Sequence, residues 1–329
     1  MVTLKCAILG ASGLVSQRLQ QRLLAHPNFE LTAVVGSENT IGKHISKLEW
    51  RLENDRPEYD LTICSITQLP KVDVVFSALP AEIAEKHERR LVEKGINVLS
   101  NASSFRMLNG IPMVIPELEK GALTTYSGHA CATNCTVVPV VLPLVGIESL
   151  LSLSDVEIST QQALSGAGWR LLYDTSLTAE NLDPFIPGEE EKVIAELKYL
   201  LHRPDLSVKA VCNRVFEQDG HLVHIKAKFN RPSNLEEIKQ AMLVTTLGLP
   251  SSPDEVVKII EDVPNRKEHL FAGGTGLASA MSVVVGNIRM ISPTEVSFSA
   301  LSHNTIRGAA GGLILLAEYL LANGHISEC

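Results

Sequence analysis

Short apolar runs alternate with helical patterns along the first third of the chain. The apolar runs lie at residues 4–10, 29–36, 72–80 and 96–103. Their continuous apolar character is typical of strands buried on both faces, whereas residues 13–26 and 81–95 place apolar side chains at helical spacing. Strand–helix–strand units require right-handed crossovers and a mostly parallel sheet with helices on its faces. We therefore expect a doubly wound α/β domain over about residues 1–133.

The pattern changes after about residue 150. The segments 153–166, 206–218 and 221–230 are longer and more alternating, which favours an antiparallel or mixed sheet with one covered face. Helical spacing returns at Glu189, near residue 236 and over residues 304–324. We expect an α+β mixed-sheet domain over residues 134–302, and a first domain formed by residues 1–133 plus 303–329.

Composition and charge exclude several classes of protein. The formal net charge of -8 carries no long run of one sign, which argues against nucleic acid or an anionic membrane as partner. The N-terminus lacks the pattern of a signal peptide, and no apolar run approaches the ~20 residues of a membrane span. The 6 cysteines form no C-x-x-C pair and no zinc pattern. We expect a cytoplasmic protein with free thiols and no metal site.

A glycine turn links the first predicted strand to the first predicted helix. Gly10 and Gly13 stand in a G-x-x-G-x-x-S spacing that ends at Ser16. In this context Gly10 makes the tight turn, Gly13 lets the backbone approach a pyrophosphate, and the helix N-terminus offers free N–H groups. Taken alone, the motif is also compatible with a simple glycine turn. At the end of the second strand, Ser37 suits a 2′-phosphate and Glu38 suits ribose hydroxyls, so the preference between NADP and NAD stays open.

The segment around Cys135 raises a question of chemistry. Asn134 precedes this thiol, and an apolar helical run follows it. A helix N-terminus lowers the pKa of a thiol, and its N–H groups, with the Asn134 amide, could receive the oxygen of a tetrahedral intermediate. The alternative is a buried cysteine behind a helix cap.

A nucleophilic thiol needs a base, and His221 is the candidate whose position can be argued. Residues 214–221 predict a hairpin with Asp219-Gly220 at its turn. In that register Arg214 and His221 share a face as diagonal neighbours and could flank one small substrate. His224 would face the other way. The alternative for His221 is a solvated histidine after a turn.

Three further groups are open to more than one interpretation. Glu189 and Lys192 open a helix, where such charges often form a solvated face. Arg106 follows two serines and could bind a phosphate or a carboxylate, or lie in a surface loop. Gly308 stands in a glycine-rich helical pattern, which indicates the close approach of a cofactor or of another helix.

Taken in order, the motifs resemble those of the aspartate-β-semialdehyde dehydrogenase family. The series is GASGLVSQR, FSALP, NASSFRM, ATNCT, QALSGAG, GEEEK, NRVFEQDGH and SHNTIRGAAGG, and it covers nearly the whole chain. The resemblance implies a Rossmann-type cofactor domain and a catalytic and dimerisation domain. It also implies the reversible NADP-dependent reductive dephosphorylation of L-aspartyl-4-phosphate to L-aspartate 4-semialdehyde, which feeds lysine, threonine, methionine and diaminopimelate synthesis. A homodimer or homotetramer is expected.

The resemblance also implies a role for each matching residue. Cys135 would be the nucleophile, Asn134 part of its oxyanion environment, His221 the acid/base, and Gln162 the residue that orients the acyl intermediate. Arg214 would hold the substrate α-carboxylate and Glu189 its amino group, while Arg106 and Lys192 would take the phosphate. The cofactor would be lined by Gly10, Ser12, Gly13, Leu14, Val15, Ser37, Ser165, Gly166 and Asn304.

Two departures and two alternatives accompany this resemblance. Ser16 replaces the small residue usual at the helix–strand contact, which predicts looser packing there. Asn39 stands where relatives often carry an arginine, which leaves Ser37 and Lys43 as candidates for the 2′-phosphate. N-acetyl-glutamyl-phosphate reductase is one alternative, because it shares the architecture. Glu189 argues against it, because this carboxylate would pair with the free ammonium of an aspartyl substrate. A non-catalytic nucleotide-binding regulator is the other alternative, and the intact set of candidate catalytic residues argues against it.

Overall fold

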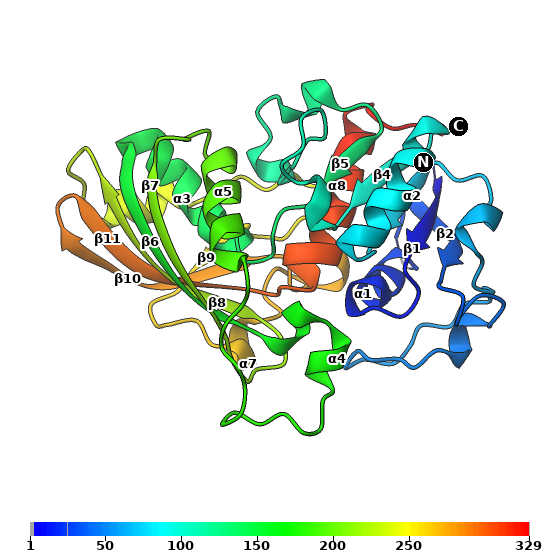
Figure 1. The fold of residues 1–329 in the computed structure, drawn as a ribbon. Coiled ribbons are helices and arrows are strands. Elements are labelled where there is room, and N and C mark those ends of the chain that lie inside the picture. Colours follow the sequence, from blue (N-terminus) through cyan, green and yellow to red (C-terminus); the bar gives the residue numbers. More distant parts are fainter. Residues whose placement is uncertain (1–2, 25, 329) are drawn as a thin grey trace. The chain divides into compact units, whose positions relative to one another are not determined.

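The computed structural model describes residues 3–24 and 26–328, which form two compact units. The first unit comprises Met1–Thr133, Leu249–Ser251 and Ala309–Cys329, and the second comprises Asn134–Gly248 and Ser252–Gly308. Each unit contains its own β-sheet (Figure 1). Cys329, one of the cysteines counted in the sequence, lies outside the described residues.

The first unit is built on a five-stranded sheet in the order β2-β1-β3-β4-β5, and every pairing in it is parallel. Its strands are β1 (Leu4–Leu9), β2 (Phe29–Val35), β3 (Val74–Ser77), β4 (Asn97–Ser100) and β5 (His129–Cys131). Its α-helices are α1 (Leu14–Leu23), α2 (Ala81–Glu93) and α8 (Gly311–Ala322). Its short 3-10 helices are η1 (Ile45–Lys47), η2 (Ile66–Gln68), η3 (Ser103–Phe105), η4 (Pro116–Leu118) and η5 (Ala122–Thr125). The predicted Rossmann-type parallel sheet is confirmed.

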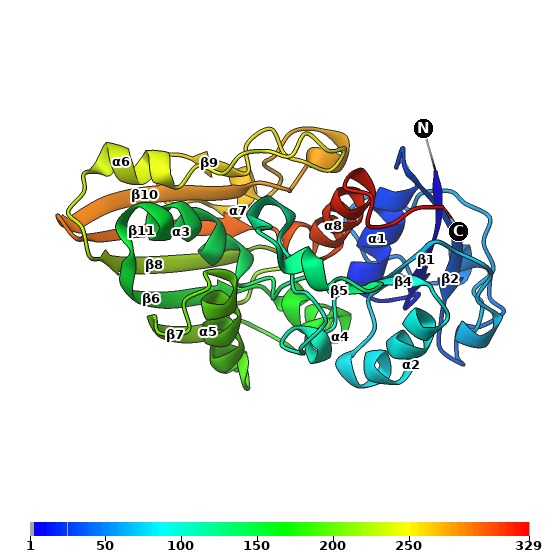
Figure 2. The ribbon, with the colours of Figure 1, turned by 90° about the horizontal axis from the view of Figure 1, so that it is seen from above.

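Side chains on both faces of this sheet are buried, which explains the continuous apolar runs. On one face, Ile8 of β1 belongs to a core that also contains Leu19 of α1 and Leu313 of α8. On the other face, Leu9 of β1 belongs to a core with Leu91 of α2. Successive side chains of a strand point to opposite faces, so β1 serves both cores. Figure 2 shows α1 and α8 side by side.

The second unit is built on a six-stranded sheet in the order β7-β6-β8-β11-β10-β9. Its strands are β6 (Leu153–Gln162), β7 (Ser207–Arg214), β8 (His221–Phe229), β9 (Val257–Ile259), β10 (Val283–Ser292) and β11 (Glu295–Ser302). The β6–β7 and β10–β9 pairs are parallel and the other pairs are antiparallel, so the predicted mixed sheet is confirmed. Its helical segments are α3 (Val138–Leu151), η6 (Leu164–Ala167), α4 (Trp169–Leu172), α5 (Glu189–Leu200), α6 (Leu235–Ala241), α7 (Arg266–His269) and η7 (Gly276–Ala278).

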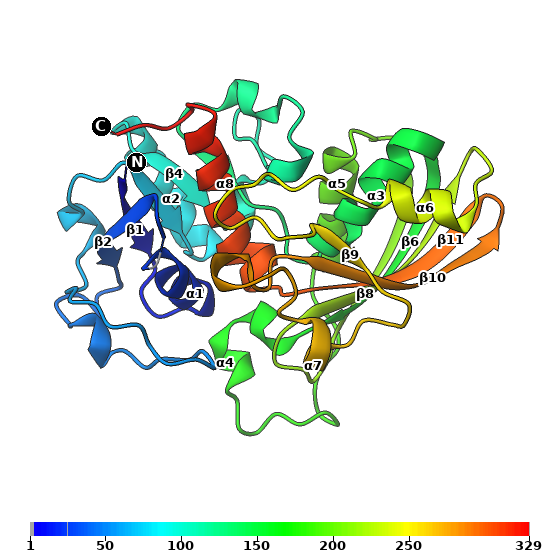
Figure 3. The same ribbon diagram turned by 180° about the vertical axis from the view of Figure 1, so that it is seen from behind.

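The two faces of this mixed sheet differ in what covers them. The helices α3 and α6 contact one face, as Figure 3 shows. On β8, Val223 and Ile225 are buried, whereas His224 between them is half-buried and lines a hollow of about 440 Å³. Glu157, Lys209, Val211 and Lys226 also line this sheet hollow. The alternation of buried and exposed residues along β8 is the pattern that predicted one covered face.

The predicted hairpin over residues 214–221 is wrong. Strand β6 lies between β7 and β8, with Gln162 opposite Arg214 in the parallel pair and Gln161 opposite Leu222 in the antiparallel pair. Gly220 has a left-handed backbone conformation, with φ 94°. The six residues 215–220 can span the ~10 Å across two strand spacings, so a strand distant in sequence can insert between their ends.

The glycine-rich segment near the C-terminus begins with a π-helical stretch, η8 (Ile306–Ala310), and continues as α8. The helix predicted over residues 304–324 therefore contains one wider turn at its start. Of the helices in residues 3–24 and 26–328, none is both long and apolar enough for a bilayer crossing.

Candidate active site

Cys135 lies in a turn that leads directly into α3. The Val137 N–H donates to the Asn134 carbonyl at 3.0 Å, which closes the turn, and α3 begins at Val138. The Asn134 side-chain oxygen accepts from the Thr136 N–H at 2.8 Å. The thiol is thus one short turn ahead of the helix and is neither fully buried nor fully exposed.

Two glutamates of α5 hold this turn. Oε1 of Glu189 accepts from Asn134 Nδ2 at 3.0 Å, from Thr136 Oγ1 at 3.2 Å and from Gln162 Nε2 at 3.2 Å. Oε2 of the buried Glu196 accepts from the Asn134 backbone N–H at 2.6 Å. Sequence reasoning missed Glu196, although its spacing of seven residues from Glu189 places both on one face of α5.

His221 begins β8 and is fully buried. Its Nδ1 accepts from the Ala163 N–H at 3.1 Å, so the proton of the neutral ring resides on Nε2. Nε2 is buried and has no hydrogen-bond partner among the described residues. Burial, followed by the charges of Arg214 and Arg266, lowers the pKa of His221 to about 3, which keeps the imidazole neutral.

Arg214 ends β7 and lies beside His221. Its Nη1 donates to the Ala163 carbonyl at 2.8 Å, so Ala163 contacts both residues through its backbone. Burial lowers the pKa of Arg214, while negative charge at Cys135 and Glu189 raises it. Arg214 therefore lies within electrostatic range of both Cys135 and Glu189.

Two glycines allow close approach around these side chains. A Cβ on Gly166 would lie 2.9 Å from Nη1 of Arg214 and 3.0 Å from Cε1 of His221. A Cβ on Gly308 would lie 2.4 Å from Cβ and 2.8 Å from Cα of Cys135. The close approach predicted at Gly308 is therefore made by the Cys135 turn, whereas the sequence suggested a cofactor or a packed helix.

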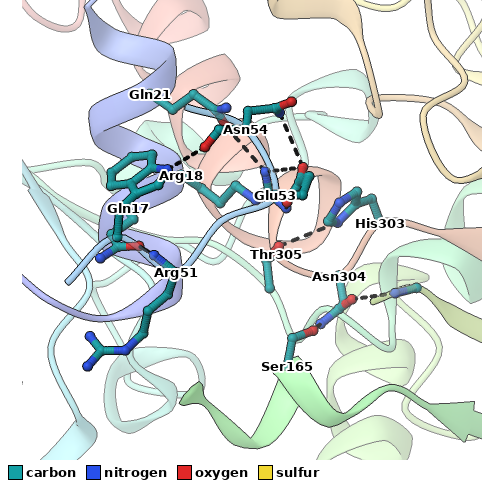
Figure 4. Close-up of polar contacts among 12 residues, drawn as sticks. Gln17, Arg18, Gln21, Arg51, Glu53, Asn54, Ser165, His303, Asn304 and Thr305 are labelled. Atoms are coloured by element: carbon teal, nitrogen blue, oxygen red, sulfur yellow. Dashed lines mark hydrogen bonds and ion pairs between the residues drawn. The ribbon is translucent and has the colours of Figure 1, made fainter. Parts of the chain in front are cut away.

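Asn304 and Ser165 form a buried pair in the same unit (Figure 4). Nδ2 of Asn304 donates to Oγ of Ser165 at 2.8 Å, and its Oδ1 accepts from the Gly220 N–H at 2.8 Å. Asn304 thus ties the turn before His221 to the segment after β6. Lys192 is exposed on α5, one turn beyond Glu189.

The glycine turn of the first unit fits a bound dinucleotide. Gly10 has φ 98°, and its N–H donates to the Val35 carbonyl at 2.9 Å, which brings the turn against the end of β2. No atom lies within 4 Å of a Cβ built on Gly13, the residue that precedes α1. This open space beside unpaired helix N–H groups is what a pyrophosphate requires. Ser12 and Val15 are half-buried, and Leu14 is buried.

The packing predicted to be loose at Ser16 is closed by hydrogen bonds. Ser16 is fully buried, its hydroxyl donates to the Gly10 carbonyl, and it accepts from Gln20 Nε2 at 3.1 Å. The serine therefore stabilises the glycine turn, and the expectation of looser packing is wrong.

The remaining candidates of the first unit lie in two other places. Ser37 is exposed just after β2. Arg106 follows η3, and its Nη2 donates to the Asn101 carbonyl at 3.0 Å. In the second unit, hydrogen bonds join Asn134, Gln162 and Glu189 at the Cys135 turn, and Arg214 lies beside His221.

Comparison with known proteins accounts for both units. Residues 5–126 match the semialdehyde dehydrogenase NAD binding domain, and residues 142–307 match the semialdehyde dehydrogenase dimerisation domain. The aspartate-semialdehyde dehydrogenase of Archaeoglobus fulgidus is 36% identical over 337 residues, which cover 95% of this chain and 97% of the relative. The chain belongs to the aspartate-semialdehyde dehydrogenase family. The resemblance inferred from the sequence motifs is confirmed.

A solved structure and a further relative are also similar to this chain over nearly its whole length. The crystal structure of aspartate semialdehyde dehydrogenase with NADP from Candida albicans has a TM-score of 0.85 and 30% identity, with 98% of this chain and 99% of that chain covered. Malonyl CoA reductase (NADP) of Metallosphaera sedula is 29% identical over 356 residues, or 99% of both chains. A protein named for a different acyl substrate is therefore also similar to this chain over nearly its whole length.

Proposed function

We propose that the chain catalyses the reversible reductive dephosphorylation of L-aspartyl-4-phosphate to L-aspartate 4-semialdehyde, with NADP as cofactor and a thioester on Cys135. One observation carries the proposal: Arg214 lies beside the unpartnered Nε2 of His221 and in the field of Cys135 and Glu189. A thiol, an imidazole and a cation–anion pair around one point are the groups that acyl transfer to and from an amino acid requires.

Cys135 is the nucleophile in this proposal. Its sulfur attacks the acyl carbon of the substrate, the acyl–phosphate bond breaks, and phosphate leaves with the bonding electron pair. Asn134, held at its backbone by Glu196 and at its side chain by Glu189, fixes the turn and offers its second amide hydrogen to the developing oxyanion. Gln162 donates to the same Glu189 oxygen and orients the acyl group.

His221 exchanges its proton with the substrate at Nε2, since Nδ1 accepts from the Ala163 N–H. In the free protein the ring is neutral and Nε2–H is a hydrogen-bond donor. To give up a proton at Nε2, the ring must carry a second proton at Nδ1, which would displace the bond from the Ala163 N–H. An anionic substrate or oxyanion favours this charged ring, because it raises the pKa of a neighbouring imidazole, and Nε2 would then protonate the oxygen of the intermediate.

Recognition of the substrate ends follows from charge. Arg214 takes the α-carboxylate, and Oε2 of Glu189 takes the α-ammonium while Oε1 keeps its three bonds. Lys192 on α5 takes the phosphate, a role that the family resemblance also implies for Arg106. An N-acetylated substrate would place an amide against the Glu189 carboxylate, and an acyl-CoA would leave it without a cation, so both alternatives fit less well.

The first unit would hold the cofactor with Gly10, Ser12, Gly13, Leu14, Val15 and Ser37. When bound, the reduced cofactor would supply the hydride that converts the acyl group to the aldehyde, and the oxidised cofactor would accept a hydride in the reverse direction. The family resemblance implies cofactor roles for Ser165, Gly166 and Asn304 as well, and Asn304 also fixes the turn before His221. We place the reaction in the cytoplasm and in the synthesis of lysine, threonine, methionine and diaminopimelate, by a homodimer or homotetramer.

A direct assay tests this function. Reduction of NADP should require both aspartate semialdehyde and inorganic phosphate, and should be faster than reduction of NAD. N-acetyl-glutamate semialdehyde and malonyl-CoA, the latter with NADPH, serve as comparison substrates. Faster turnover of either would assign the chain to another activity of the same architecture.

A further inference from the structure

Hydrogen bonds and an ion pair hold the loop between β2 and β3 against α1, the first helix of the first unit. Gln17 of α1 is almost fully buried; its Nε2 donates to the Glu49 carbonyl at 2.7 Å and its Oε1 accepts from the Arg51 N–H at 2.8 Å. Arg18 of α1 pairs with both carboxylate oxygens of Glu53 at 2.7 Å. Figure 4 shows the contacts of Gln17 with Arg51 and of Arg18 with Glu53, and the Arg51 side chain extending away from Gln17. Residues 49–53 are thus fixed beside the first turns of α1.

This anchoring places a guanidinium on the glycine turn. Nη1 of Arg51 donates to the Ser12 carbonyl at 3.1 Å, between Gly10 and Gly13. The side chain of Arg51 is only 10% exposed, and Nη2 contacts Oε2 of Glu49 at 2.5 Å. Glu49 itself is 71% exposed at its side chain, so its carboxylate is largely solvated. The Arg51 guanidinium is therefore held beside the glycine turn by both the Ser12 backbone and the Glu49 carboxylate.

The same edge of the sheet is where a 2′-phosphate would lie. The Gly10 N–H donates to the Val35 carbonyl, so the glycine turn and the end of β2 are neighbours. In dinucleotide folds the adenosine ribose is recognised at the end of the second strand, and an arginine nearby accommodates a 2′-phosphate. Here Ser37, Glu38 and Asn39 follow β2 and are exposed, and none of them carries positive charge.

We propose that Arg51, which the loop between β2 and β3 places beside the glycine turn, binds the 2′-phosphate of NADP and sets the preference for NADP over NAD. Its planar fork suits a phosphate, and its pinned backbone reduces the entropy lost on binding. Ser37 would add a hydroxyl from β2. The inference deepens the proposed function and rests on it.

The experiment compares cofactor binding by the wild type and by Arg51→Met, using isothermal titration with NADP and with NAD. A charge-assisted contact predicts that the Kd for NADP rises about tenfold to a hundredfold in Arg51→Met, while the Kd for NAD stays within about twofold. Lys47→Met removes an exposed cation from the same loop between β2 and β3 and should leave both Kd values unchanged. Lys43→Met tests the cation nearest to the end of β2 in sequence.

The outcomes separate the inference from the proposed function. Equal weakening of NADP and NAD in Arg51→Met would overturn the inference, because the arginine would then serve the turn alone. Loss of discrimination in Lys43→Met but not in Arg51→Met would also overturn it. A wild type that binds both cofactors equally would overturn both the inference and the NADP preference, whereas aspartate semialdehyde turnover tests the rest of the proposed function independently.

Discussion

His221 carries two properties that single residues rarely combine. It is fully buried, and the ring nitrogen that has no hydrogen-bond partner among the described residues is the one that bears the proton. Burial and two arginines together disfavour its charged form. His221 is therefore neutral in the free protein, and an anion bound beside it would favour its charged form and so allow proton exchange.

Substitution of His221 tests its place in the chemistry. In His221→Asn, kcat should fall by about 10²- to 10⁴-fold, the usual contribution of a positioned acid/base group. Alkylation of Cys135 by iodoacetamide, followed by mass spectrometry, should still proceed, because the turn is held by Glu189 and Glu196. An unchanged kcat would remove His221 from the mechanism.

The same residue should make stability depend on pH. Its pKa is about 3 in the folded protein and near its ordinary value when unfolded, so the unfolded chain binds more protons between these values. The free energy of unfolding should therefore fall as pH decreases from about 6.5 to about 3, and be insensitive to His221 above that window. Urea titrations of the wild type and His221→Asn should give curves that converge at low pH; parallel curves would contradict this assignment.

At the scale of elements, α5 and η8 build the nucleophile's surroundings. Helix α5 contributes Glu189 and Glu196 to Asn134, and η8 brings Gly308 against Cys135. A π-helical turn widens the helix by one residue, and such turns are frequent at functional sites. The glycine is required because a methyl group there would overlap the Cys135 backbone.

Gly308→Ala tests this packing. The added Cβ would lie 2.4 Å from Cβ of Cys135, so the turn must shift, and kcat should fall by at least about tenfold. Gly146→Ala is a matched control, since its Cβ would lie 1.8 Å from the Ala241 carbonyl oxygen and would disturb α3 against α6. Circular dichroism and kcat per folded molecule should show that only Gly308→Ala impairs chemistry; equal losses would mean general destabilisation.

Sequence patterns predicted most elements but not every neighbour. The continuous apolar character of β1 and the alternation of β8 each reported burial directly, and these strands were found where expected. Gly220 has the positive φ that suits a glycine after a strand, but nothing local could reveal that β6 inserts between β7 and β8. Glu196 could not be found from the local pattern, because the acceptor role of a buried carboxylate depends on a backbone amide 62 residues away.

At the scale of the whole molecule, the exposed face of the mixed sheet is where we expect copies of the chain to associate. Val211, 54% exposed on the edge strand β7, lines the sheet hollow together with polar residues of β6 and β8. The match of residues 142–307 to a dimerisation domain gives this unit that role in the family.

Val211→Glu should weaken this association. A buried carboxylate without a partner is costly at an interface, so sedimentation equilibrium should show a dissociation constant raised by at least about tenfold. Leu150→Glu, at the end of α3, also replaces an exposed apolar residue and should leave the assembly unchanged. An unaltered assembly in Val211→Glu would place the contact elsewhere.

The covalent intermediate is the claim on which the mechanism depends. Mixing wild-type protein with aspartate semialdehyde and NADP, without phosphate, should give a burst of NADPH equal to the concentration of active sites. Rapid acid quench and peptide mass spectrometry should then find an aspartyl group on Cys135. A burst with an unmodified Cys135 peptide, or an undiminished burst in Cys135→Ala, would contradict the account.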